Sequence, residues 1–441
     1  MHPAAMETTK RMKLRLLAIV AMAAMAPLAS AQLRIDITKG VTDPIPLAIV
    51  PFASAAAPGG VDVAAVIQRD LDGSGRFRGM DRNALPARPT QASEVDAARW
   101  RSLGNDYVVV GRTVARSPTE TTLAFDLVNV LNGQVLLTGT ENVPTNLLRQ
   151  GAHRVADRIY EKITGVRGAF ATRIAYVSVD GQPPGQQYQL LIADADGENA
   201  RIALKSGQPL MSPAWSADGQ WLAYVSFEGR ASAIYVQRWR TGERRQVSAR
   251  AGVNGAPSFS PDGKRLALTL SGNTGNLDVY VLDLATQALT RITEDPAIDT
   301  EAAWSPDGQT LYFTSDRGGG PQVYAAEPRA GSRARRITFG ANYAARPRVA
   351  PDGKSLAVVT QDSGGFKVGV VDLASGQVTS LSRGTLDESP SFAPNGAALI
   401  YAGRERGQGM LATVSVDGLV TQRLKADQGE VREPVWGPFA N

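Results

Sequence analysis

The chain contains no cysteine, which excludes disulfide bonds and cysteine-ligated metal centres. Histidine is nearly as scarce, since only His2 and His153 occur. His153 falls in a predicted helix beside Arg154 and Asp157, and no nucleophile or metal partner can be identified for it. We therefore interpret it as a structural residue of that helix.

The chain also lacks a basic face of the kind that binds nucleic acid. It has 47 Lys and Arg against 42 Asp and Glu, a net charge of +5. The first 31 residues hold four of these cations and one acid, a net of +3, which leaves about +2 (5 − 3) for the rest. The densest later cluster, Arg333, Arg335 and Arg336, is typical of a solvated turn.

No apolar run is long enough to span a bilayer, which takes about 20 residues. The longest run, Leu16 to Leu28, follows Lys13 and Arg15 and precedes Ala29-Ser30-Ala31. This order is typical of a secretory signal peptide, residues 1–31, cleaved after Ala31. An uncleaved anchor is the alternative, and translation could also start at Met12. We expect an exported protein that begins at Gln32.

A repeat of constant period fills the C-terminal part. Segments such as SPAWSADGQWLAYVS (212–226) and EAAWSPDGQTLYFTS (301–315) align with one another. The bulky residue recurs every 43 to 45 positions, at Trp215, Phe259, Trp304, Val349, Phe392 and Trp436. This spacing is that of four-stranded propeller blades. The Pro-Asp-Gly sequence after it is a turn signal.

The two ends of the array complement each other. Arg173 to Ser178 resembles the second strand of a blade but has no Pro-x-Trp before it, and Pro434-Val435-Trp436 is a first strand with nothing after it. The chain end would thus complete the first blade and close a six-bladed ring without exposed edges. An open solenoid is the alternative.

The sequence therefore predicts a multi-domain protein with a six-bladed β-propeller at residues 167–441. Residues 32–166 lack the repeat and are predicted to form an α/β domain with a mixed sheet. Helices are expected from Val61 to Leu71 and from Asn146 to Thr164, closed by Gly165. Strands are expected at 47–50, 106–114, 123–130 and 134–140, and a linker at 166–172.

Catalytic signatures are missing. No G-x-S-x-G elbow of a propeller-capped hydrolase occurs. Asp194-Ala195-Asp196-Gly197-Glu198 resembles part of a calcium loop, but the later ligands are absent, so we expect a hairpin turn. The Asp of Pro-Asp-Gly repeats from blade to blade, which indicates a turn. We predict that the protein is not an enzyme and uses no cofactor or metal.

The leader, the α/β domain and the Pro-x-Trp-Ser-Pro-Asp-Gly repeats together resemble the TolB family of the bacterial Tol–Pal envelope system. The likeness is strong at 172–176, 208–215, 254–257 and 386–388. It implies a non-enzymatic periplasmic adaptor that supports outer-membrane integrity and constriction during cell division. It also implies two partners, the Pal lipoprotein on the propeller and TolA on a segment just after the signal peptide.

The candidate TolA segment is 32–43, where apolar and polar residues alternate as in a strand that adds to a sheet edge. An ordinary first strand of the domain is the alternative. Its predicted contact residues are Gln32, Leu33, Arg34, Ile35, Asp36 and Ile37. The family's acidic start is absent here, where the segment has Gln32 and Lys39 and is followed by Pro44, so we expect the affinity for TolA to differ.

The Pal site is expected at one mouth of the ring, on the loops that precede each Pro-x-Trp strand. These loops vary between blades, and ordinary sequence variation of loops is the alternative explanation. The candidates are Leu210, Met211, Val253, Asn254, Ala256, Thr300, Glu301, Arg346, Asp387, Glu388 and Arg432. Glu301 and Glu388 could ligate a weakly held calcium ion in the channel, and the sequence leaves that alternative open. A hydrolase or lyase with channel carboxylates is the main alternative function. A glycan-binding propeller would need aromatic residues at the mouth, and these candidates include none.

Overall fold

The structure, a computed structural model, describes residues 43–54, 60–272, 275–405, 407–424 and 429–439. The predicted leader and most of the candidate TolA segment lie outside these residues. Within the described residues, no helix is both long and apolar enough to cross a membrane.

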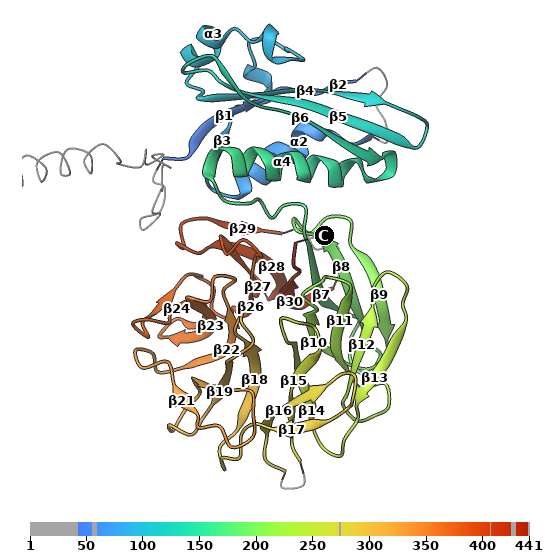
Figure 1. Ribbon diagram of the computed structural model, residues 1–441, viewed down its shortest axis with the longest axis vertical. Helices are drawn as coiled ribbons and strands as arrows, with labels where there is room; N and C mark the ends of the chain where they lie inside the picture. Colours follow the sequence, from blue (N-terminus) through green and yellow to red (C-terminus); the bar gives the residue numbers. More distant parts are fainter. Residues whose placement is uncertain (1–42, 55–59, 273–274, 406, 425–428, 440–441) are drawn as a thin grey trace, which may run out of the picture. The chain divides into compact units, whose positions relative to one another are not determined.

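The N-terminal domain is built on one mixed sheet (Figure 1). Its strand order is β3-β1-β4-β5-β6, and β2 pairs with β4. Strands β1, β3 and β4 are parallel, whereas β5 and β6 continue antiparallel. The strands are β1 (Ile45–Ile49), β2 (Ala53–Ser54), β3 (Phe77–Gly79), β4 (Tyr107–Ala115), β5 (Glu120–Asn129) and β6 (Gln134–Pro144).

Helices α2 (Val63–Gly73) and α4 (Leu148–Thr164) cover one face of this sheet, and α3 (Ala97–Ser102) packs on the other. Asp62 caps α2 by accepting a hydrogen bond from the Ala65 amide at 3.0 Å. Gly165 ends α4 with a φ of 75°, a conformation that glycine adopts at no steric cost. Short 3-10 turns span Arg82–Ala84, Ala92–Glu94 and Thr145–Leu147.

The rest of the described chain forms six four-stranded antiparallel sheets, the blades. Three of them follow one another directly. These are β10 (Leu210–Trp215), β11 (Trp221–Ser226), β12 (Ala233–Arg238) and β13 (Arg244–Ser248); β14 (Asn254–Phe259), β15 (Arg265–Leu270), β16 (Asp278–Asp283) and β17 (Leu289–Arg291); and β18 (Asp299–Trp304), β19 (Leu311–Ser315), β20 (Gln322–Ala326) and β21 (Arg335–Arg336).

Two further blades follow, and the sixth joins both ends of the array. They are β22 (Ala344–Val349), β23 (Ser355–Asp362), β24 (Gly365–Asp372) and β25 (Val378–Ser380); β26 (Glu388–Phe392), β27 (Ala398–Glu405), β28 (Gln408–Ser415) and β29 (Thr421–Arg423); and β30 (Glu430–Trp436) with β7 (Arg173–Asp180), β8 (Gln187–Asp194) and β9 (Arg201–Ser206).

The ring is closed, as the sequence predicted. The C-terminal strand β30 pairs antiparallel with β7, with Trp436 opposite Ile174. The first strand of each blade contacts the first strands of both neighbouring blades, so β10, β14, β18, β22, β26 and β30 surround a central channel. Buried apolar residues fill the spaces between adjacent blades. The alternative of an open solenoid is wrong.

These first strands define two faces of the ring. We call the face where they begin the mouth face, and the face where they end the turn face. On the turn face, Asp262 of the Pro-Asp-Gly turn accepts hydrogen bonds from the Ser260 hydroxyl at 2.5 Å and the Lys264 amide at 3.1 Å. Its role as a turn residue, expected from its repetition, is confirmed.

Every first strand also carries a β-bulge that the sequence did not predict. One residue at each bulge has a positive φ, of 45° to 58°, in all six blades. These residues are Ser212, Ala256, Glu301, Arg346, Ser389 and Glu433. A bulge re-aims the side chains around it, and a positive φ is costly for residues other than glycine, so the ring maintains a strained backbone in every first strand.

Candidate functional site

Apolar side chains are exposed at the mouth face in several blades. Val253 and Ile298 stand three residues before the bulge residue of their strands and are 45% and 46% exposed. Leu386 holds the same position in another blade and is 39% exposed. Met211, one residue before a bulge, is 40% exposed. The loops beside the channel therefore present separate apolar side chains to the surroundings, a feature of protein-binding surfaces.

Three of the predicted mouth residues have buried side chains instead. Leu210, Asn254 and Asp387 all stand two residues before a bulge and are at most 1% exposed. Asn254 accepts hydrogen bonds from the Ser248 hydroxyl at 2.6 Å and the Arg250 amide at 3.0 Å, which fixes the loop before β14. These residues shape the mouth from beneath and do not form its surface.

Charged side chains occupy the bulge positions around Arg346. Its guanidinium group donates to Glu301 at 2.5 Å through Nε and to the Ser389 hydroxyl at 2.5 Å. Glu433 lies 3.5 Å from it, and Glu388 lies 4.0 Å from it. The two glutamates Glu301 and Glu433 raise the pKa of Arg346, although burial opposes them. One arginine thus ties together four blades.

The Arg346 cluster argues against the catalytic and calcium alternatives. Glu433 also accepts a hydrogen bond from the Ser212 amide, so its oxygens are engaged on both sides. A carboxylate that acts as a general acid or base must be able to exchange a proton with a substrate, whereas Glu301 and Glu433 are paired with Arg346. Here Arg346 takes the position that a calcium ion would take between Glu301 and Glu433. We interpret the cluster as a structural clasp of the channel.

The other predicted mouth residues lie on the same strands. Thr300 bonds the hydroxyl of Thr269 at 3.2 Å, across two blades. The side chains of Glu388 and Arg432 are 44% and 37% exposed, so charged groups stand beside the apolar ones. Ala256 is a bulge residue with a φ of 45°. Sequence reasoning missed Ile298 and Leu386, although each lies six residues before the bulky residue of its repeat, as the predicted Val253 does.

The candidate TolA residues Gln32, Leu33, Arg34, Ile35, Asp36 and Ile37 lie outside the described residues. The structure leaves them as a prediction. The first described residues of the chain lead directly into β1, whose Ile45 pairs with Phe77 of β3.

A second polar cluster forms where the N-terminal domain contacts the turn face. His153 of α4 is fully buried, and its Nδ1 lies 2.7 Å from Oδ2 of Asp70 on α2. Asp194 and Asp196, in the turn between β8 and β9, face the same ring. The hairpin predicted for this turn is confirmed, because Asp194 and Arg201 end and begin neighbouring strands.

Asp70, His153 and Asp196 lie close enough together to suggest a metal site. Arg149, however, forms an ion pair with Asp196 and lies 3.7 Å from Asp194. The guanidinium group already supplies the positive charge that these carboxylates need. We therefore interpret this group as an ion-pair cluster and not as a metal centre.

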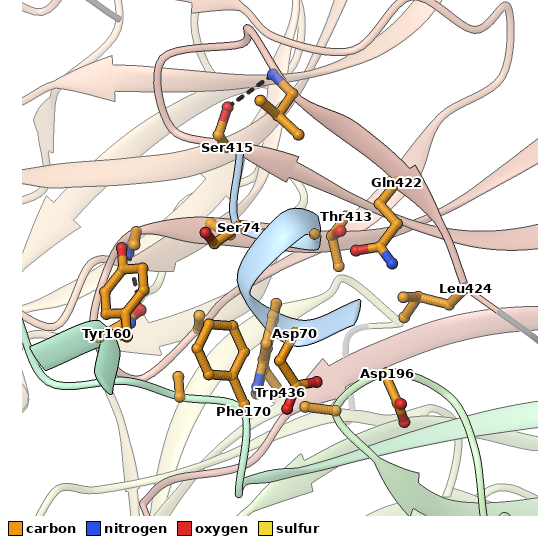
Figure 2. Close-up of a pocket in the computed structure, with 18 of the residues that line it drawn as sticks. Asp70, Ser74, Tyr160, Phe170, Asp196, Thr413, Ser415, Gln422, Leu424 and Trp436 are labelled. Carbon is orange, nitrogen blue, oxygen red and sulfur yellow. Dashed lines mark hydrogen bonds between the residues drawn. The ribbon is translucent and has the colours of Figure 1, made fainter. Parts of the chain in front are cut away.

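A pocket adjoins this cluster (Figure 2). Asp70 and Tyr160 line it from the N-terminal domain, Phe170 from the linker, and Asp196, Gln422 and Trp436 from the propeller. Trp436 donates to the Thr172 hydroxyl at 2.8 Å, and Asn395 donates to the Arg167 carbonyl at 2.9 Å. The turn face is thus partly covered, whereas the mouth face presents its apolar side chains.

Comparison with known proteins identifies the family. The model of the TolB amino-terminal domain matches residues 33–136, and that of the TolB beta propeller domain matches residues 160–440. The chain is 46% identical over 412 residues to the Tol-Pal system protein TolB of Xanthomonas oryzae pv. oryzae (strain MAFF 311018), which covers 92% of this chain and 93% of that protein.

A second relative and a solved structure agree. The Tol-Pal system protein TolB of Xylella fastidiosa (strain Temecula1) is 46% identical over 413 residues, with the same coverage. The crystal structure of TolB from Acinetobacter baumannii matches with a TM-score of 0.84 and 41% identity, over 90% of this chain and 97% of that one. On the matches of both domains and of nearly its whole length, the chain belongs to the TolB family of Tol-Pal system proteins.

Proposed function

We propose that this protein is a non-enzymatic periplasmic adaptor of the Tol–Pal system, supporting outer-membrane integrity and constriction during division. It binds the Pal lipoprotein through the mouth face of the propeller and TolA through residues 32–37. The observation that carries the Pal contact is the set of exposed apolar residues Met211, Val253, Ile298 and Leu386, which stand beside the channel in four blades.

The chemistry of the mouth face suits a protein partner. Protein interfaces combine a buried apolar centre with a polar rim and bury about 800 Å² on each partner. Here the apolar residues are interspersed with Glu388 and Arg432, whose charges could select a partner of matching charge. The loops that carry Ile298 and Leu386 lead into β18 and β26, whose bulge residues Glu301 and Ser389 are held by Arg346, so little order has to be gained there on binding.

The proposal for TolA rests on the sequence of residues 32–37 and on family membership. Alternating apolar and polar residues allow a segment to add as a strand to the edge of another sheet. Such binding depends on backbone hydrogen bonds and on the side chains of one face. We expect Ile35→Asp with Ile37→Asp to weaken TolA binding at least tenfold while leaving Pal binding unchanged.

Calorimetric titration of the full chain with Pal from the same species tests the mouth site. We expect Val253→Asp with Ile298→Asp to weaken binding at least tenfold, because two charges would enter the buried centre of the interface. Leu419→Asp is the matched control, because Leu419 is also an exposed aliphatic side chain, 53% exposed, but lies in the turn after β28 on the turn face. Equal loss in both variants, or no Pal binding by the unaltered chain, would overturn the proposal.

A further inference from the structure

His153 lies at the junction between the two domains and is surrounded by charge. Asp70 and Arg69 face it from α2, and Arg149 and Asp157 from its own helix α4. From the propeller come Asp194, Asp196 and Glu198 of the β8–β9 turn, and Arg173 of β7. The ring itself is fully buried, so these groups and not water determine its protonation.

The two nitrogens of the ring have different surroundings. Nδ1 is 2.7 Å from the Asp70 carboxylate, which makes it the donor in the neutral ring. Nε2 then carries a lone pair, and the structure gives this buried atom no hydrogen-bond partner. The group that it faces is the Asp194 carboxylate, whose Oδ2 is 4.0 Å away. A lone pair facing a carboxylate is unfavourable, and a proton on Nε2 would turn that contact into an attraction.

The charged groups around His153 carry an excess of negative charge. Counted as ionised, the acids are Asp70, Asp157, Asp194, Asp196 and Glu198 and the bases are Arg69, Arg149 and Arg173, a difference of two negative charges. A proton on His153 reduces this excess to one. Buried charge is costly unless it is compensated, so the protonated ring favours contact between the domains.

We propose that His153 is a proton-dependent latch, which holds α4 of the N-terminal domain against the β8–β9 turn of the propeller when the ring is protonated. Loss of the proton loosens this contact. The latch would make the coupling between the two domains sensitive to periplasmic acidity. The inference depends on the junction alone and stands whether or not the mouth face binds Pal.

The direction of the pKa shifts agrees with this geometry. Burial lowers the pKa of His153, but Asp70, Asp196 and Asp194 more than offset it and raise the pKa above its usual value. Burial also raises the pKa of Asp70, although the neighbouring His153 opposes this shift. Because both folded-state pKa values are raised, the stabilisation is complete below the unfolded values and is lost as the pH rises through the folded ones.

Nuclear magnetic resonance of the His153 ring in the full chain tests the first half of the latch. His2 and His153 are the only histidines, and His153→Gln identifies the signal. We expect a pKa above about 6.5 that falls by about one unit, a tenfold loss of proton affinity, in Asp196→Asn. Asp307→Asn, in a turn of another blade, is the control and should leave it unchanged. An unchanged pKa in both Asp196→Asn and Asp194→Asn would mean that Asp70 alone sets it, and the latch would be wrong.

Distance measurement tests the second half. Because the chain has no cysteine, Leu131→Cys and Val253→Cys give one exposed spin-label site in each domain. Pulsed electron resonance should show a narrow distance distribution at about pH 6 and a broader one at about pH 9, in the range where histidine titrates. His153→Gln should remove this difference between the two pH values. Identical distributions at both pH values in the unaltered protein would overturn the proposal, whatever the ring pKa.

Discussion

The two faces of the propeller use the same strands for different purposes. At the turn face, each Ser/Ala-Pro-Asp-Gly turn repeats a similar geometry, and the N-terminal domain contacts part of that face. At the mouth face, the blades differ from one another: apolar residues are exposed in some, and charged residues meet around Arg346 in others. Repetition therefore marks residues that maintain the fold, and variation at equivalent positions marks residues available for recognition.

The backbone shows the same difference. In the turns that follow the first strands, positive φ belongs to glycine, as at Gly263 and Gly308, where it carries no steric cost. At the bulges within the first strands, positive φ belongs to residues with side chains, including Glu301 and Arg346. Such a conformation costs about 1–2 kcal/mol for each residue. The ring maintains six of them, and their repetition in every blade assigns the bulges to the fold, whereas their side chains differ from blade to blade.

The largest expected effect comes from removing the strand that closes the ring. Deletion of residues 430–441 leaves β7 without its partner β30 and removes the hydrogen bond from Trp436 to Thr172. Because every blade depends on both neighbours, we expect both faces to lose their structure together. Circular dichroism during heating should show no cooperative transition in the range of the full chain. A deletion variant with an unchanged transition would show that closure contributes little.

The next effect concerns the linker beneath the turn face. Asp157 accepts hydrogen bonds from the amides of Phe170 and Ala171, at 2.7 and 3.2 Å. Burial raises the pKa of Asp157 to about 7, so stability is complete below the unfolded value near 3.8 and falls as the pH rises to about 7. We expect Asp157→Asn to flatten this slope while costing about 1 kcal/mol for the weakened bonds.

Urea unfolding at several pH values between about 4 and 8 measures this slope. Asp126→Asn is a suitable control because Asp126 also accepts a backbone hydrogen bond, from Ala92 at 2.9 Å, but lies on the sheet away from the linker. A slope that persists in Asp157→Asn would assign it to other groups, with His153 and Asp70 the next candidates.

The next expected effect is confined to a single turn. Gly263 has a φ of 69°, and no atom would obstruct a side chain there, so only backbone strain opposes substitution. Gly263→Val should cost about 1–2 kcal/mol, whereas Lys264→Val, one residue later, should change stability much less. Both are measured by urea unfolding, and Pal binding should stay intact in both. Loss of Pal binding in Gly263→Val without unfolding would erase the distinction between the faces.

The smallest effect on stability should come from the mouth residues themselves. Val253→Ser and Leu386→Ser remove exposed apolar surface that contributes little to the core, so we expect changes within about 0.5 kcal/mol. The same measurement on Asn254→Ala should show a larger loss, because its side chain holds the preceding loop. A large loss of stability in Val253→Ser would mean that the mouth residues serve the fold.

The fold could be predicted from the sequence because the sequence motif of each blade repeats at a constant spacing. The spacing of Trp215, Trp304 and Trp436 predicted the blades, and the unmatched strands at 173 and 434 predicted the closure. Helix α4 was predicted within two residues at its start, since its apolar spacing and Gly165 are both local signals. Strands β2 and β3 and helix α3 were not predicted, because two to six residues carry too little periodicity.

The candidate site could be predicted from the sequence only in part. The loops of the mouth could be listed by counting back from the Pro-x-Trp motif, but that list mixed surface residues with the buried Leu210, Asn254 and Asp387. The bulges change which side chains face outward, and no local sequence pattern predicts the bulges. The charged surroundings of His153 were equally hidden, because Asp194 and Asp196 come from a turn about 40 residues away in the other domain.

Hydrogen exchange of the full chain with and without Pal tests the difference between the faces most directly. We expect slower exchange in peptides that contain 209–212, 252–256, 297–301 and 386–389. Peptides that contain the turns at 261–263 and 306–308 should exchange at the same rate with and without Pal. Protection confined to the turns, or spread equally over both faces, would contradict the assignment of recognition to the mouth face.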